Sequence, residues 1–174
     1  MSRQLTSGVL GRKGVVIEIG MEYQGGYVGY IFSEGDIGYV SGETHGIIIM
    51  DGIFDGYTWG PNGLVSGLLP DIGKGKDNTD IIINTFPDVH TAAKLCDDAI
   101  INGYNDWFCP SSQEILSIYN NLYADNITQW GNRLWISQMA TSSISSFGRI
   151  LYNTGSIANN ARSDLRQIKA CRYF

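Results

Sequence analysis

The chain has 174 residues, 43% of them hydrophobic, which predicts one globular domain with a core of its own. Its formal net charge of −5 at pH 7, with Lys and Arg scattered, argues against nucleic acid or an anionic membrane surface as a partner. No apolar run is long enough for membrane insertion, and the first residues lack the apolar core of a cleavable signal peptide.

Strands are predicted in the first part of the chain, after residues 1–13, which we expect to be an arm, a tag remnant or a connection to an upstream segment. Val15–Ile19 is apolar, and Tyr27–Phe32 is rich in aromatic and β-branched residues. Gly46–Met50 is apolar without alternation, which indicates a strand buried on both faces. Between the last two strands, Ser33–Gly38 has the composition of a turn.

The middle of the chain is predicted to hold two helices after a long irregular stretch. Residues 51–79 show no clear period, and a loop of this length packs on its own side chains or carries function. Asp88 is expected to cap the first helix, whose apolar stripe runs over Val89–Ile100 and which ends at Gly103.

The second helix is predicted to begin at Ser111 and to run to about Tyr123. Ser111 and Glu114 have the spacing of a capping box, in which each side chain binds a free backbone N–H of the first turn. Trp107 brings a large apolar surface to the start of this helix. We interpret Trp107, Ser111 and Glu114, together with Trp135 further along, as structural residues of the core.

The last third of the chain predicts three strands, Arg133–Ser137, Phe147–Tyr152 and Gln167–Phe174. Ser, Thr, Asn and Gly dominate the two segments between them, Ser137–Ser146 and Asn153–Asp164, which are therefore expected to be loops. Two helices with short strands on both sides predict an α+β fold.

Signals for catalysis are weak. Gly67–Lys76 lacks the spacing of a phosphate-binding loop, so a surface turn is the better interpretation. His45 and His90 are the only histidines, and neither has a partner at the spacing of a catalytic triad or a metal site. We therefore expect no catalytic residue, no cofactor and no enzyme activity.

Signals for metal binding are also weak. Asp51 and Asp55 stand beside glycines and lack the spaced oxygen ligands of a calcium loop, so they are better explained as turn formers. Calcium in an irregular loop stays open as the alternative. Cys96, Cys109 and Cys171 are too widely spaced for a zinc or redox motif and are expected to be buried, inert thiols. No metal site is predicted.

A set of short pieces, in order from about Gly26 to Phe174, carries a resemblance to a known family. The pieces are Gly29–Phe32, His45–Ile47, Trp59–Gly60, Gly75–Thr79, Ala92–Ala93, Cys96, Gly103–Trp107, Pro110–Ser111, Glu114–Ile115, Leu134–Ser137 and Arg172–Phe174. On these pieces the chain resembles the C-terminal domain family of the Lcl collagen-like adhesins, found in bacterial surface proteins and phage tail proteins. Cys109 and Ile136 depart from the Leu and Ser usual in that family.

The resemblance implies a C-type-lectin-like fold, related to the formylglycine-generating enzyme fold without its chemistry, in which two helices pack on small twisted antiparallel sheets with long irregular loops. We therefore divide the chain into residues 1–24, an N-terminal arm with the first strand, and residues 25–174, a ligand-binding domain. Similar domains are variable proteins of diversity-generating retroelements, which rewrite Asn codons. Residues 141–166 are largely drawn from the resulting residue types, although ordinary loops have the same composition.

The expected ligand-binding surface is formed by the polar loops near the end of the chain. Tyr adds contact area there at low entropic cost, and Arg adds planar hydrogen bonding. A contact role and a core role are equally open for Trp130. The expected ligand-binding residues are Trp130, Gln138, Thr141, Ser143, Ser145, Arg149, Tyr152, Asn153, Asn159, Asn160, Arg162 and Asp164.

These expectations together predict a receptor-binding module of a phage tail fibre or a surface-adhesion domain, located on the virion or on the bacterial cell surface. Its partner would be a host-cell surface receptor, either a glycan or a protein, and the resemblance implies a homotrimer at the end of a fibre. Two alternatives stay open. One is an enzyme acting on a surface polysaccharide, with carboxylates or a histidine meeting near Trp59, and the other is a structural subunit of a tail or surface assembly.

Overall fold

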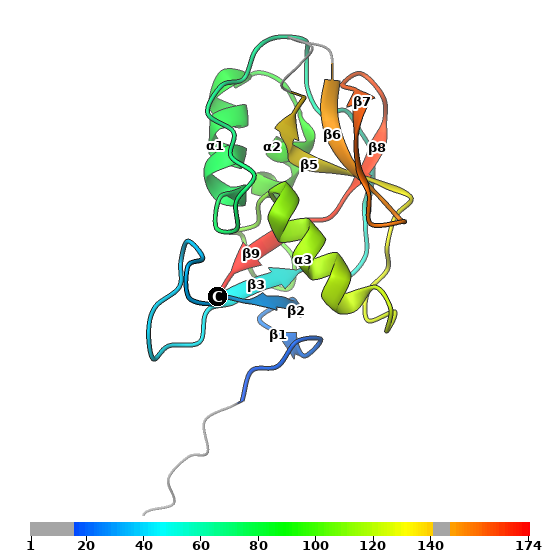
Figure 1. The fold of residues 1–174 in the computed structure, drawn as a ribbon. Helices are drawn as coiled ribbons and strands as arrows, with labels where there is room; N and C mark the ends of the chain where they lie inside the picture. Colours follow the sequence, from blue (N-terminus) through cyan, green and yellow to red (C-terminus); the bar gives the residue numbers. More distant parts are fainter. Residues whose placement is uncertain (1–15, 141–146) are drawn as a thin grey trace, which may run out of the picture.

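The computed structural model describes residues 16–140 and 147–174 of the chain (Figure 1). In these ranges the elements are, in chain order, β1 (Glu22–Tyr23), β2 (Gly26–Ile31), β3 (Gly46–Ile49), β4 (Phe54–Tyr57), α1 (Gly75–Thr85), α2 (Ala92–Asp98), α3 (Ser112–Leu122), β5 (Arg133–Met139), β6 (Phe147–Tyr152), β7 (Ile157–Ala161), β8 (Arg166–Ile168) and β9 (Cys171–Tyr173). They form an α+β fold with two mostly antiparallel sheets, which confirms the predicted fold class. Within these ranges every helix is too short or too polar to cross a membrane.

The first sheet has the order β1-β2-β3-β9 and is antiparallel throughout. Ile47, Ile48 and Ile49 of β3 have no exposed surface, since the strand lies between β2 and β9 and is covered on both faces. The predicted doubly buried strand is thus confirmed. Because β9 comes from the end of the chain, this sheet joins the first and last parts of the sequence (Figure 1).

The second sheet has the order β4-β8-β5-β6-β7, in which β5 and β8 are parallel and the other pairs antiparallel. β6 and β7 form a hairpin, and β7 is one edge of the sheet. The capped helix α3 contacts β2 of the first sheet and both β5 and β6 of the second (Figure 1). This helix therefore holds the two sheets together.

The helix α1 begins inside the stretch 51–79 that the sequence predicted to be irregular and continues to Thr85, so that prediction is wrong for residues 75–79. Its N-cap residue, Lys74, makes no side-chain capping hydrogen bond, so the local sequence carries no start signal. The free N–H groups of Gly73 and Gly75 donate instead to the Glu114 carboxylate of α3, at 3.0 and 3.3 Å. The cap of α1 therefore comes from another helix.

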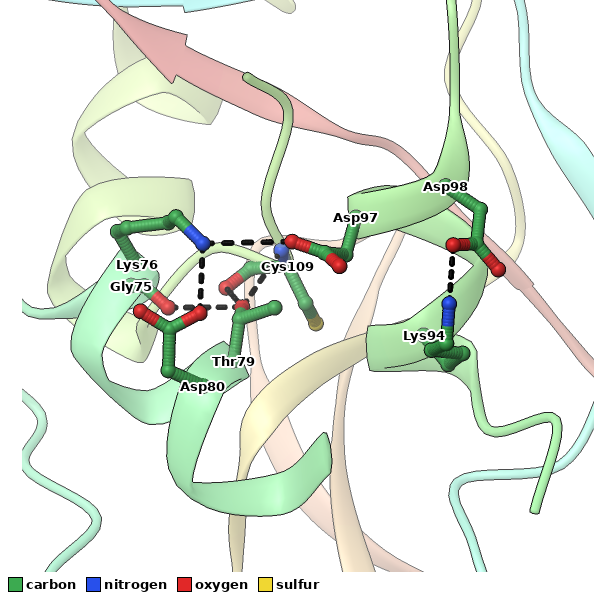
Figure 2. Close-up of polar contacts among 8 residues, drawn as sticks. All are labelled: Gly75, Lys76, Thr79, Asp80, Lys94, Asp97, Asp98 and Cys109. Carbon is green, nitrogen blue, oxygen red and sulfur yellow. Dashed lines mark hydrogen bonds and ion pairs between the residues drawn. The ribbon is translucent and has the colours of Figure 1, made fainter. Parts of the chain in front are cut away.

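The helix α2 begins later than predicted. Its N-cap is Thr91, whose Oγ1 accepts a hydrogen bond from the Lys94 backbone N–H at 3.0 Å, so Asp88 is not the cap. Figure 2 shows how α2 is tied to α1: the Lys76 ammonium lies 2.6 Å from an Asp80 carboxylate oxygen and 3.3 Å from one of Asp97. Of these two half-exposed ion pairs, the one between Lys76 and Asp97 joins the two helices, and each adds little stability.

Two strand predictions and one loop prediction need correction. Val16–Ile19 forms no strand, and Val16 is 73% exposed because no neighbouring strand covers this apolar run. The stretch Asn153–Asp164, predicted to be a loop, contains β7, whose polar residues are compatible with an edge strand that pairs through its backbone. Gln167–Phe174 is two strands in different sheets, β8 and β9, separated at Lys169 and Ala170.

The predicted structural residues lie in the core. Trp107 and Trp135 have no exposed surface, and their indole N–H groups donate to the backbone oxygens of Tyr104 at 2.9 Å and Tyr57 at 2.8 Å. The capping box is formed: the Glu114 backbone N–H donates to Ser111 Oγ, and the Ser111 N–H donates to Glu114 Oε2. The structure thus shows both tryptophans buried and the predicted capping box formed.

Candidate functional site

The candidate site is a cavity of about 380 Å³ beside the end of β5 and the start of β6. This volume lies within the range of small-ligand sites in proteins, about 300–1,000 Å³. Two residues of the predicted ligand-binding surface, Gln138 and Arg149, meet in it. The lining residues are Leu64, Val65, Ser66, Gly67, Leu68, Pro70, Gln138, Met139, Ala140 and Arg149.

One wall of the cavity is the segment 64–70, which side-chain hydrogen bonds hold against the core. The Val65 N–H donates to the Met139 sulfur at 3.4 Å. The Asn78 amide of α1 pairs with the backbone of Leu69 in both directions, donating at 2.7 Å and accepting at 2.9 Å. Asn78 itself is 1% exposed, so the wall is fixed by a buried polar anchor. Sequence patterns could not reveal this wall, because the segment has no period.

Two polar side chains of the cavity, Gln138 and Arg149, differ in whether they already form hydrogen bonds within the described residues. Gln138 Oε1 accepts a hydrogen bond from the Ser112 N–H at 3.2 Å, at the start of α3. Arg149 lies on β6, and its Nε is buried without a hydrogen-bond partner in the described part of the chain. A buried guanidinium N–H without a partner is uncommon, because each such group costs about 1–3 kcal/mol. A ligand in the cavity could supply the missing acceptor.

The charge of the cavity is positive. Its lining contains no Asp or Glu, and Arg149 forms no salt bridge with any residue in 16–140 or 147–174. An unpaired arginine beside apolar walls favours a planar anion such as a carboxylate, which the guanidinium can bind through two parallel hydrogen bonds. Leu64 is 66% exposed at the same place and offers apolar surface to the rest of a ligand.

Arg162 does not lie on an exposed surface, and that expectation is wrong. Its side chain has no exposed surface, its Nη1 donates to the backbone oxygens of Pro61 at 2.8 Å and Gly63 at 2.6 Å, and its guanidinium lies 4.0 Å from the Trp59 ring. Burial lowers the pKa of Arg162 to about 10. Arg162 thus holds the segment 61–63 in place through two hydrogen bonds. It also fills the space beside Trp59, where the alternative hypothesis of an enzyme expected the catalytic cleft.

Asn160 is also buried, contrary to its expected place on the surface. Its Nδ2 donates to Asp164 Oδ2 at 2.7 Å, and Arg166 Nη2 donates to Asn160 Oδ1 at 3.2 Å and to Asp164 Oδ2 at 2.6 Å. The three side chains close the turn between β7 and β8. They stabilise the fold there, and Asp164 keeps only part of its surface exposed.

Of the remaining predicted residues, Trp130 lies half-buried in the segment between α3 and β5, and the others lie along the β6–β7 hairpin or outside the described residues. Asn159 is exposed and stands directly opposite Arg149 across the two strands. Tyr152 and Asn153 lie at the far end of the hairpin, where the Arg133 guanidinium is 5.4 Å from the Tyr152 ring. The predicted contacts Thr141, Ser143 and Ser145 are outside the described residues. The structure therefore spreads the predicted residues over both ends of β6.

A buried lysine occupies the oxygen-rich region near Asp51, where calcium was the alternative interpretation. Lys169 Nζ donates to Gly52 O at 2.6 Å, to Thr128 Oγ1 at 2.9 Å and to Gln129 O at 2.9 Å. Burial lowers its pKa to about 8. The Lys169 ammonium thus provides, at these oxygens, the positive charge that a calcium ion would otherwise provide. Among residues 16–140 and 147–174 no group of three or more His, Cys, Asp or Glu is placed to hold a metal.

Neither a known protein-family model nor a curated protein gives a significant match to the chain.

Proposed function

We propose that this protein is a ligand-binding module with a C-type-lectin-like fold, acting as the receptor-binding domain of a phage tail fibre or as a bacterial surface-adhesion domain. The α+β architecture is compatible with such a fold, and the ordered sequence pieces from Gly26 to Phe174 resemble that family. Recognition takes place at the cavity lined by Gln138 and Arg149. A trimeric assembly on a virion or cell surface belongs to the same proposal.

The observation that carries the proposal is the Nε of Arg149, which has no partner among the described residues and lies on the wall of a cavity whose described lining contains no acidic residue. A carboxylate would satisfy this group and neutralise its charge, and the apolar walls at Leu64 and Leu68 would cover the ligand's less polar face. A surface polysaccharide with uronic acid units combines these features. We therefore take an acidic saccharide as the receptor of this site.

The test is binding of the purified protein to immobilised polyuronates and to whole bacterial cells. Arg149→Ala should weaken binding roughly tenfold to a hundredfold, the loss expected for one charge-assisted hydrogen-bonded pair. Arg149→Lys should restore only part of the affinity, because a lysine cannot form the planar pair. Arg133→Ala is the matched control: it removes an exposed arginine on the neighbouring strand and should leave binding unchanged. If both alanine variants lost the same affinity, the binding would be explained by unspecific charge attraction, and the proposal would be overturned.

Diversification of the chain's end is the second part of the proposal, and the structure narrows the residues it would use. Asn159 and Ser163 are exposed, and Arg149 and Tyr152 are half-exposed. These residues can therefore be substituted without creating a cavity in the core. Asn160 and Arg162 hold the fold and should stay constant. The DNA around the gene tests this: a reverse transcriptase and a repeat that matches the 3′ end except at adenines should be present, and their absence would refute diversification.

A further inference from the structure

A second pocket, of about 520 Å³, lies between the segment that follows α3 and the turn that follows β3. It shares no residue with the cavity at Arg149. Residues from three separate parts of the chain meet in it, and most of them carry polar groups. They are Tyr27, Asp51, Tyr123, Asn126, Ile127, Thr128, Gln129 and Trp130.

The aromatic residues of this pocket are held in fixed orientations. Tyr123 stacks on Tyr119 with ring centres 4.4 Å apart and an angle of 24° between the rings. Trp130 stands edge-on against both tyrosines, at 5.2 Å from Tyr119 and 6.2 Å from Tyr123. Tyr123 keeps 37% of its surface exposed. The pocket therefore presents a preorganised aromatic face, which lowers the entropic cost of stacking a ligand on it.

The indole N–H of Trp130 differs from those of the other tryptophans. Trp59, Trp107 and Trp135 each donate to a backbone oxygen, at 2.8, 2.9 and 2.8 Å respectively. Trp130 Nε1 is buried and has no hydrogen-bond partner in the described residues. Because a buried N–H without an acceptor is costly, this group calls for an acceptor beyond the described residues, which a ligand can supply.

Other hydrogen-bonding groups of the pocket are also uncommitted. Asp51 uses Oδ1 to accept from the Gly52 N–H at 3.0 Å and from Thr128 Oγ1 at 3.3 Å. Its Oδ2, and the side-chain amides of Asn126 and Gln129, make no hydrogen bond within residues 16–140 and 147–174. Planar carboxylate and amide groups with free donors and acceptors suit a ligand that carries several hydroxyl groups.

The charge around the pocket distinguishes it from the cavity at Arg149. The Asp51 carboxylate lies near the Lys169 ammonium, which Thr128 and Gln129 hold behind the pocket. The two opposite charges leave the region close to neutral, so neither an anion nor a cation is favoured there. An uncharged ligand avoids the cost of burying a further charge.

We propose that this pocket is a second binding site, for an uncharged saccharide unit that stacks on Tyr123 and Trp130 and whose hydroxyl groups bind Asp51, Asn126 and Gln129. The assignment goes beyond the recognition proposed at Arg149, since it uses other residues and a ligand of different charge. A chain with both sites would bind two units of one polysaccharide, which raises avidity when their spacing fits.

The test uses the four indole N–H resonances in the ¹H–¹⁵N NMR spectrum of the full chain, with Trp130 assigned through Trp130→Phe. Methyl glycosides of glucose, galactose, mannose and N-acetylglucosamine serve as probes, with methyl glucuronide as the charged comparison. At least one neutral glycoside should shift the Trp130 indole resonance and leave the three internally bonded indoles in place. Gln129→Ala, which removes a side chain without hydrogen bonds in the described structure, should reduce that shift several-fold.

A matched pair of variants completes the experiment. Tyr123→Ala removes the stacking face, whereas Tyr39→Ala removes a tyrosine of similar exposure, 38%, on the loop between β2 and β3. Tyr123→Ala should abolish the response to the neutral glycoside, and Tyr39→Ala should keep it. No shift of Trp130 with any neutral glycoside would overturn the proposal, and so would a stronger response to methyl glucuronide. Either result would leave the Arg149 site untouched, because binding there is measured with polyuronates and Arg149 variants.

Discussion

The Tyr173 hydroxyl donates a hydrogen bond to Glu114 Oε1 at 2.6 Å and so connects the last strand of the chain to the capping box of α3. The same carboxylate accepts from the Ser111 N–H at 2.7 Å and from the N–H groups of Gly73 and Gly75 at the start of α1. One buried carboxylate therefore joins two helix starts to the sheet edge, and four donors offset part of the cost of its burial.

Replacing Glu114 with Gln should destabilise the protein. A glutamine presents an NH₂ group to at least one N–H donor of this site and leaves that donor unsatisfied, which lowers the free energy of unfolding by about 1–3 kcal/mol. Urea denaturation followed by tryptophan fluorescence measures the change. Gln113→Ala is the matched control, because Gln113 is exposed on the same helix turn. An unchanged urea midpoint in Glu114→Gln would show that the carboxylate is not needed for stability.

The pH dependence of stability should also reveal Glu114. Burial raises the pKa of this carboxyl above its ordinary value of 4.5, against the hydrogen bonds that lower it. The folded protein thus binds the proton more tightly than the unfolded chain, so the unfolding free energy falls as pH rises from 4.5 to the raised pKa. The advantage of the wild type over Glu114→Gln should therefore shrink across this window in urea titrations. An advantage that grows with pH would mean that the pKa is lowered.

Glu114 also shows what the sequence could reveal about the fold. Its spacing from Ser111 is a local signal, so the start of α3 could be predicted. The same side chain caps α1 from 41 residues away in sequence, and no local pattern shows such a contact. No helix was therefore predicted over Gly75–Thr85, whose first residues fall in the stretch 51–79 that was expected to be irregular.

The candidate site, like the fold, could be predicted only where the signal was local in sequence. Gln138 directly follows the predicted strand Arg133–Ser137, Arg149 lies in the predicted strand Phe147–Tyr152, and both line the cavity. Arg162 looked like a loop residue because Ser and Asn surround it, yet the Trp59 ring and two distant carbonyl groups bury it. Residue type and neighbours in sequence do not determine burial when the covering group comes from a distant segment.

Arg162→Ala should therefore act on stability and not directly on binding. Removing the guanidinium leaves the carbonyl oxygens of Pro61 and Gly63 without a donor and opens space beside Trp59, which should cost about 2–4 kcal/mol. Thermal unfolding measures this loss. At a temperature where the variant is still folded, its affinity for polyuronates should equal that of the wild type. A selective loss of affinity with unchanged stability would restore Arg162 to the ligand-binding surface.

The three cysteines should be inert in the folded protein. Cys96, Cys109 and Cys171 are free and buried, and burial raises the pKa of the Cys96 and Cys171 thiols well above the ordinary value. A thiol-specific reagent at neutral pH should therefore label none of them under native conditions and all of them in denaturant. Mass spectrometry of the labelled chain gives the count. Rapid labelling of any cysteine in native buffer would contradict the buried arrangement.

Lys169 should make the fold depend on pH in the alkaline range. Its pKa is lowered from 10.5 to about 8 by burial, so between these values the unfolded chain binds more protons than the folded one. The contribution of this lysine to the unfolding free energy should therefore rise with pH from about 8 to 10.5. Buried cysteine and tyrosine groups with raised pKa values act in the opposite direction, so the lysine must be isolated by a variant.

Lys169→Met provides that comparison. At neutral pH it leaves Gly52 O, Gln129 O and Thr128 Oγ1 without their common donor and should lower the unfolding free energy by about 2–4 kcal/mol. Lys94→Met, which removes a lysine paired with Asp98 on the surface of α2, should change it by less than about 1 kcal/mol. The difference between wild type and Lys169→Met in urea titrations should widen as pH rises above 8. A difference that is constant or narrows with pH would mean that burial does not lower the pKa of Lys169.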